Sequence, residues 1–81
     1  MKRQFVVQQF LNITGMNKLQ FSKYVHIDRA VIYKYLMGHS VSNGAIYQLK
    51  YYYDEYCIAN DLDNKLFDVV ISEIEKGGNN E

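Results

Sequence analysis

The sequence predicts an all-α fold in which five helices form one compact domain. Apolar residues recur mostly at spacings of three and four, which is the period of a helix with one buried face. Proline is absent and no Gly/Ser-rich stretch interrupts the 81 residues, so a second domain is not expected. The composition, 48% hydrophobic and 22% charged, is typical of a globular chain. Residues 1–76 are therefore predicted to form the domain, and residues 77–81 a disordered polar tail.

The first helix is predicted over residues 3–12. Val6, Phe10 and Ile13 follow one another at steps of four and three, so they are expected to share a buried face. The helix should stop near Gly15, because glycine readily takes the left-handed conformation that ends many helices.

The second helix has a clear predicted start. Asn17 is a favourable N-cap, and Met16 before it can pack onto Phe21 in the first turn. Phe21 and Val25 then lie one turn apart on the predicted buried face. Only Ile27 and Asp28 fit comfortably between this helix and the next.

The third helix is predicted over residues 28–37, with Asp28 as its N-cap. It should end at Met37 and Gly38. The side chains expected to point inward are Ile32, Tyr35 and Leu36.

Residues 40–49 allow two interpretations. Ser42 can cap a fourth helix, but Asn43-Gly44 is also a strong hairpin signal, which would make this segment a β-wing. The helix is favoured because the apolar row keeps a helical phase far beyond the hairpin signal. That row is Ile46, Leu49, Tyr53 and Tyr56.

A fifth helix is predicted over residues 61–76, capped by Asn60 or Asp61. Its acidic first turn suits the helix dipole. It carries a wide apolar stripe that is expected to bind a second subunit or a protein partner, although the helix could instead close the core of its own chain. The stripe consists of Leu62, Leu66, Phe67, Val70, Ile71 and Ile74.

The net charge of zero conceals two oppositely charged parts. Residues 1–53 contain seven basic residues and one acidic residue, and therefore carry a formal charge of +6. Residues 54–81 contain two basic and eight acidic residues, and carry −6. Such asymmetry is expected when one part binds a polyanion, or it is a bipolar surface without a function.

Residues 18–37 have the pattern of two short helices that cross steeply at a tight turn. Ser22 occupies a position where the two helices approach closely and a small side chain is needed. The turn itself contains His26, a residue type that tolerates left-handed backbone better than most. The positions that must be apolar for the pair to pack are Phe21, Val25, Ile27, Ile32 and Tyr35.

This motif resembles the helix-turn-helix of the Cro and phage-repressor (Xre-like) family, and the resemblance extends over about residues 3–58. The chain departs from the family pattern in three places. His26 stands where the family usually has glycine, and Lys18 where it usually has glutamine. No proline precedes the fourth helix. The resemblance implies a lambda repressor-like fold and sequence-specific binding to double-stranded DNA, commonly as a homodimer on a palindromic site.

In that interpretation the helix of residues 28–37 lies in a major groove, as a bacterial or phage transcriptional regulator would place it. Arg29 can donate two hydrogen bonds to guanine, and Ala30 can touch a thymine methyl. The predicted base-reading residues are Arg29, Ala30, Tyr33 and Lys34. The predicted phosphate contacts are Asn17, Lys18, His39, Ser40, Ser42 and Asn43.

The eight tyrosines could instead suggest stacking on single-stranded bases. Consecutive helical residues point about 100° apart, so residues 51–53 cannot form one platform. Most of these rings are expected in the core or an interface, with Tyr47 and Tyr51 the most exposed.

The main alternative function is a protein-interaction module, such as an antirepressor or inhibitor from a mobile element, that binds its partner through the fifth helix. No enzyme activity is expected, because no nucleophile-base pair or phosphate loop is recognisable. His26 and His39 lack metal-ligand spacing, and no metal or cofactor is expected. Cys57, the lone cysteine, is predicted to be a small core residue in a cytoplasmic protein without a membrane segment.

Overall fold

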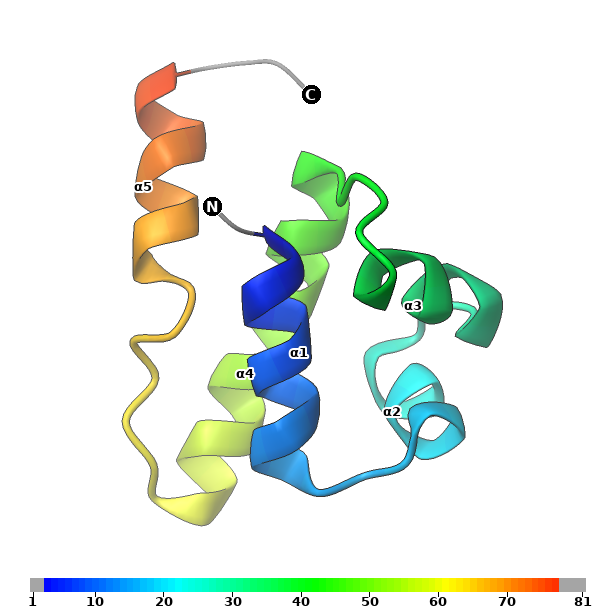
Figure 1. Ribbon diagram of the computed structural model, residues 1–81. Coiled ribbons are helices and arrows are strands. Elements are labelled where there is room, and N and C mark those ends of the chain that lie inside the picture. The colour runs from blue at the N-terminus through cyan, green and yellow to red at the C-terminus, as the bar shows by residue number, and fades with distance from the viewer. Residues whose placement is uncertain (1–2, 78–81) are drawn as a thin grey trace.

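The computed structural model describes residues 3–77, which form five helices and no strand (Figure 1). This confirms the predicted compact all-α domain. None of these helices is long and apolar enough to span a bilayer. The predicted tail falls mostly on residues 78–81, which lie outside the described part. The helices are α1 (Arg3–Thr14), α2 (Lys18–Val25), α3 (Arg29–Leu36), α4 (Asn43–Asn60) and α5 (Asp68–Gly77).

Three predicted N-caps are confirmed. The Asn17 side chain accepts a hydrogen bond from Gln20 N, and the Gln20 side chain accepts one from Asn17 N, which completes a capping box. Asp28 accepts from Ala30 N at the start of α3. Ser42 accepts from Ala45 N at the start of α4. Each cap satisfies a backbone donor that the first turn of a helix leaves without a partner.

The core is built around one aromatic ring of α1. Phe10 is fully buried and meets three other rings edge-on, with centroid distances of 4.9 Å to Phe21, 5.1 Å to Tyr53 and 6.2 Å to Phe67. Such edge-to-face geometry is favourable beyond the apolar area that it buries. These four rings come from α1, α2, α4 and the segment before α5, so one cluster joins distant parts of the chain.

The predicted inward row of α1 needs one correction. Val6 and Phe10 are buried as expected, but Ile13 is 40% exposed. Val7 and Leu11 are buried in addition. The buried face therefore centres on the side of Val7 and Phe10, because α3 and α4 both pack on α1 there.

α4 runs without interruption from Asn43 to Asn60, so the β-wing is wrong. Asn43 and Gly44, which could have formed a hairpin turn, are instead the first two residues of α4. The Ser42 cap stabilises this helix start. Cys57 is buried, as predicted, whereas Tyr56 is only partly buried.

The predicted start of the fifth helix at residue 61 is also wrong. Asp61 takes a left-handed conformation (φ 56°) and ends α4, with its N–H donating to Cys57 O and Ile58 O. The segment that follows is held on α4, because Asp63 O accepts from the Tyr53 hydroxyl at 3.3 Å. α5 begins only at Asp68, after Phe67 has entered the core.

Burial of Tyr53 predicts alkaline destabilisation. Burial and the neighbouring Cys57, Asp63 and Asp54 raise the pKa of Tyr53 to about 12. The unfolded chain loses this proton near pH 10, so the stability contributed by the neutral phenol is complete below pH 10 and is lost as the pH rises to about 12.

We therefore expect the free energy of unfolding, measured by urea titration, to fall between pH 10 and about pH 12. Tyr53→Phe should flatten this decline. The matched control is Tyr47→Phe on the exposed side of α4, which should leave it unchanged. An equally steep decline in Tyr53→Phe would contradict the assignment.

Candidate nucleic-acid interface

The tight turn between α2 and α3 has the predicted backbone conformation. His26 is left-handed (φ 58°), and both His26 N and Ile27 N donate to Ser22 O. Ser22 is buried, as its place between the helices requires. Of the five predicted apolar positions, Phe21, Val25 and Ile32 are buried, whereas Ile27 and Tyr35 are half-buried.

The outer face of α3 carries all four predicted base-reading residues. Ile32 is fully buried, and its burial fixes which side of the helix points outward. Because α3 is only eight residues long, its exposed side chains stay within about two turns of each other. The exposed side chains are Arg29, Ala30, Tyr33 and Lys34.

Lys18 joins this face from α2. Its Nζ lies 5.5 Å from the centroid of the Tyr33 ring, within the range of a cation–π contact. The sequence did not indicate this pairing, because the two residues are on different helices whose crossing is set by the buried side chains. A predicted phosphate contact and a predicted base contact are thus brought together.

An open groove runs between α2 and α3 beside these residues. Leu19 is exposed at the edge of this groove, although it was not among the residues predicted for the site. Its spacing is informative in retrospect, since it is out of phase with the buried pair Phe21 and Val25. The groove is lined by Leu19, Ser22, Lys23, Ile27, Asp28, Arg29, Ala30 and Tyr33.

The loop between α3 and α4 is held in place by α1. Arg3 Nη1 donates to Val41 O at 2.6 Å, and Gln4 Nε2 donates to His39 O at 3.0 Å. His39 and Ser40, two predicted phosphate contacts, are exposed on this loop. The backbone of this loop is therefore fixed by side chains that lie 35 and 38 residues earlier in the chain.

The remaining predicted phosphate contacts occupy helix starts. Asn17 is exposed, but its side-chain oxygen is engaged in the α2 cap. Ser42 is exposed and its hydroxyl oxygen caps α4. Asn43 is half-buried, and its Oδ1 is buried without a hydrogen-bond partner among the described residues.

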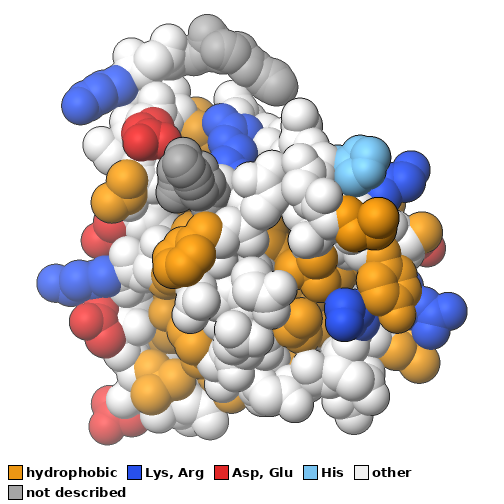
Figure 2. All heavy atoms as spheres, viewed as in Figure 1, with side chains coloured by type: hydrophobic (Ala, Val, Ile, Leu, Met, Phe, Trp, Pro, Cys, Tyr) orange, Lys and Arg blue, Asp and Glu red, His pale blue; other side chains and the backbone are white. Residues whose placement is uncertain are grey.

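Most of the acidic residues that the structure describes belong to the end of α4, to α5 and to the segment between these helices. In Figure 1, α5 and the α2–α3 pair lie on opposite sides of α1. In Figure 2, Asp and Glu side chains gather along the α5 side, where some Lys or Arg side chains also lie, and the α2–α3 side carries Lys, Arg and His side chains with apolar groups between them. This arrangement keeps most carboxylates away from a polyanion bound at α3.

The apolar stripe that was predicted to bind a partner is largely used in the core of its own chain. Phe67 and Val70 are 1% and 2% exposed, so these two residues close the core of their own chain and cannot meet a partner. Leu66, Ile71 and Ile74 pack against the same core and are half-buried. Leu62 is exposed, but it lies in the segment before α5.

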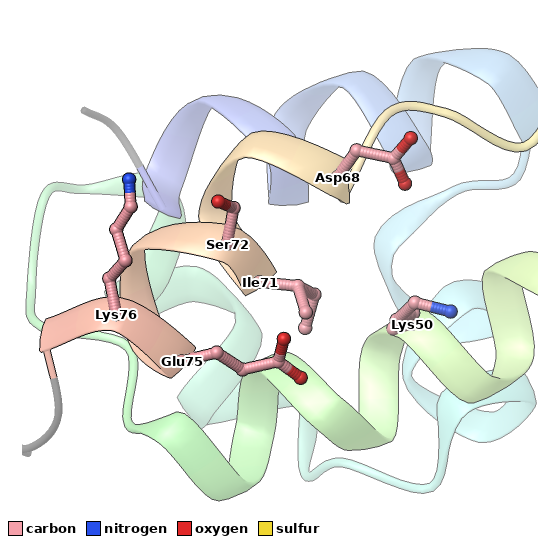
Figure 3. Close-up of a pocket in the computed structure, with 6 residues that line it drawn as sticks. All are labelled: Lys50, Asp68, Ile71, Ser72, Glu75 and Lys76. Carbon is pink, nitrogen blue, oxygen red and sulfur yellow. The ribbon is translucent and has the colours of Figure 1, made fainter.

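A second hollow lies between α4 and α5 (Figure 3). Lys50 approaches it from α4, while Ile71 and Glu75 point toward it from α5. Positive and negative side chains are mixed there, since Asp68 and Lys76 also line it. Residues 3–77 contain no group of three or more His, Cys, Asp or Glu side chains arranged to hold a metal ion.

The chain has no match among protein-family models, curated proteins or solved structures. What it does must therefore be inferred from its own geometry. The strongest feature is the outer face of α3, where one basic, partly apolar surface is built from residues of two helices.

Proposed function

We propose that the protein is a sequence-specific double-stranded DNA-binding transcriptional regulator that inserts α3 into the major groove. The observation that carries this proposal is the exposure of Arg29, Ala30, Tyr33 and Lys34 on one helix. The major groove of B-DNA is about 12 Å wide and accepts a single α-helix. A helix-turn-helix presents its second helix in this way, with the first residues of that helix nearest the bases.

Each of the four exposed side chains of α3 is chemically suited to contact DNA in the major groove. Arg29, in the first turn, can donate two hydrogen bonds to guanine O6 and N7. Ala30 and the ring of Tyr33 can contact thymine methyl groups. Lys34, one turn further along, reaches a base or a phosphate. Together they distinguish base pairs by hydrogen bonds and by apolar contact.

Lys18 is proposed to bind phosphate. It lies in the first turn of α2, where the helix dipole favours an anion, and its ammonium group is already placed beside α3 by Tyr33.

Occupation of an operator would exclude polymerase, and a homodimer would read two half-sites about one helical turn apart.

The proposal predicts salt-dependent duplex binding. The purified chain is used to select sites from a random duplex library, and binding to the selected duplex is followed by fluorescence anisotropy. Neutralised phosphates release counterions, so the Kd should rise steeply between about 50 and 200 mM salt. Lys18→Ala should weaken selected and scrambled duplexes by similar factors.

The matched control is Lys65→Ala, in the segment before α5, which removes an exposed lysine from the acidic side and should leave binding unchanged. A selection that enriches no sequence, together with salt-independent binding, would contradict the proposal.

The α2–α3 groove favours a second candidate function, binding of a protein. Leu19 and Tyr33 are exposed beside Ile27, and Lys23 and Arg29 border them, so an acidic segment with apolar side chains would fit. The zero net charge also suits a protein partner better than a polyanion. This alternative predicts that no duplex is preferred and that Leu19→Gln abolishes partner binding.

A further inference from the structure

The α3–α4 loop, residues 37–42, belongs to no helix, and all of its residues except Val41 are exposed. Its beginning is tied to the end of α3, because Gly38 N and His39 N donate to carbonyl groups of that helix. Beyond these bonds, the burial of Val41 is the only apolar anchor within the loop. The exposed part carries predicted phosphate contacts, so the position of its backbone matters for DNA binding.

The first turn of α1 holds this loop from outside. Arg3 Nη1 donates to Val41 O at 2.6 Å. Gln4 Nε2 donates to His39 O at 3.0 Å and to Gly38 O at 3.3 Å. Two adjacent side chains thus bind three carbonyl groups that lie 34 to 38 residues later in the chain.

These hydrogen bonds also determine which way the loop faces. In a trans peptide, the C=O and the N–H of one unit point in opposite directions. The carbonyl groups of His39 and Val41 are turned toward α1, so the N–H groups of Ser40 and Ser42 point away from it. The side of the loop that faces away from α1 therefore presents backbone donors beside the exposed Ser40 side chain.

We propose that Arg3 and Gln4 are positioning residues for the phosphate contacts of the α3–α4 loop. This inference rests on the proposed function, because it concerns how the predicted phosphate contacts His39, Ser40 and Ser42 are held. Both side chains act through the backbone of the loop and not by touching DNA. A loop that is fixed before binding loses less conformational freedom when it meets a phosphate, so the affinity is higher.

Arg3 therefore differs in role from the other cations of the basic part. It is one of the seven basic residues that give residues 1–53 their formal charge of +6. Its guanidinium is used within the chain, in a charge-assisted hydrogen bond. Arg3→Met should weaken duplex binding but leave the slope of log Kd against log salt nearly unchanged, whereas Lys18→Ala should lower that slope by about 1. An equal drop in Arg3→Met would show that Arg3 contacts phosphate directly.

Gln4→Met tests the proposal without changing any charge. Methionine has nearly the length of glutamine but no donor, so the carbonyl groups of Gly38 and His39 lose their partner. Affinity for selected and scrambled duplexes should fall by a similar factor of about 5, because phosphate contacts do not read sequence. The matched control is Gln8→Met on the same helix. Gln8 Nε2 donates to Asn12 Oδ1 instead, so its loss should leave the Kd unchanged.

Two measurements separate positioning from a general loss of structure. Ser40→Ala should weaken binding in the wild-type chain but add little in Gln4→Met, because the loop has already lost its position. Without DNA, the ¹⁵N order parameter of the Ser40 amide should fall below about 0.6 in Gln4→Met. The urea midpoint should stay near the wild-type value in the same variant.

The outcomes distinguish this inference from the proposed function. If the wild-type chain selects a duplex but Gln4→Met binds it equally well, the positioning role is overturned and the proposed function stands. Full additivity with Ser40→Ala, or an unchanged order parameter, would overturn the positioning role in the same way. A wild-type chain that selects no duplex would overturn the proposed function, and this inference with it.

Discussion

Phe10→Ala is expected to remove most of the stability of the domain and to bring it close to its unfolding midpoint at room temperature. The Phe10 ring is fully buried and contacts Phe21, Tyr53 and Phe67, so its removal opens a cavity where several elements meet. Such a substitution costs about 3–5 kcal/mol, whereas small domains have a total stability of about 5–15 kcal/mol. At 81 residues this chain belongs at the low end of that range.

Urea unfolding followed by circular dichroism measures this effect. The transition midpoint should fall to little or no urea in Phe10→Ala. Phe5→Ala is the matched control, because Phe5 is on the same helix but 54% exposed, and its loss should change stability by about 0.5 kcal/mol or less. Equal losses in the two variants would show that Phe10 does not hold the core together.

The sequence predicted those features of the fold that depend on neighbouring residues. The caps at Asn17, Asp28 and Ser42 are correct because each uses a side chain two or three positions from its backbone partner. The left-handed His26 is correct because the short connection between two helices leaves few alternatives. Helical spacing was also sufficient to identify the buried residues of α2 and most of those of α4.

The start of α5 could not be predicted in this way. Asp61 is as suitable an N-cap as Asp28 by residue type, yet it ends α4 in a left-handed conformation. Its role is decided by distant contacts, because the segment after it must bring Phe67 beside Phe10 and Tyr53. A helix beginning at residue 61 would have kept residues 62–67 helical, whereas the structure uses them as the connection to the core.

In the candidate interface, too, neighbouring residues could be placed from the sequence, whereas contacts between helices could not. Arg29 and Tyr33 could be placed together from their spacing on one helix, and the structure has both exposed. The contact of Lys18 with Tyr33 and the groove beside Leu19 depend on the crossing of α2 and α3. The exposure of Tyr47 and Tyr51 on α4 was expected from the sequence and is confirmed, whereas the exposure of Ile58 depends on the full length of α4.

Arg29→Ala is expected to remove most of the base preference at one position of the bound DNA. A bidentate arginine–guanine contact contributes about 1–3 kcal/mol of discrimination, so affinity for the selected duplex should fall by roughly 5- to 150-fold. Affinity for a scrambled duplex should fall much less, because phosphate contacts such as Lys18 remain. The ratio of the two Kd values, measured at one salt concentration, is therefore the informative quantity.

Two further variants separate base recognition from charge. Arg29→Lys keeps the positive charge but lacks the planar pair of donors, so it should restore affinity for scrambled duplex without restoring the preference. Lys23→Ala removes a neighbouring cation of the groove and should leave the preference intact. If Arg29→Ala weakened both duplexes by the same factor, Arg29 would act only through its charge. Recognition would then have to come from Ala30, Tyr33 and Lys34, and repeating the site selection with Arg29→Ala would return the original sequence.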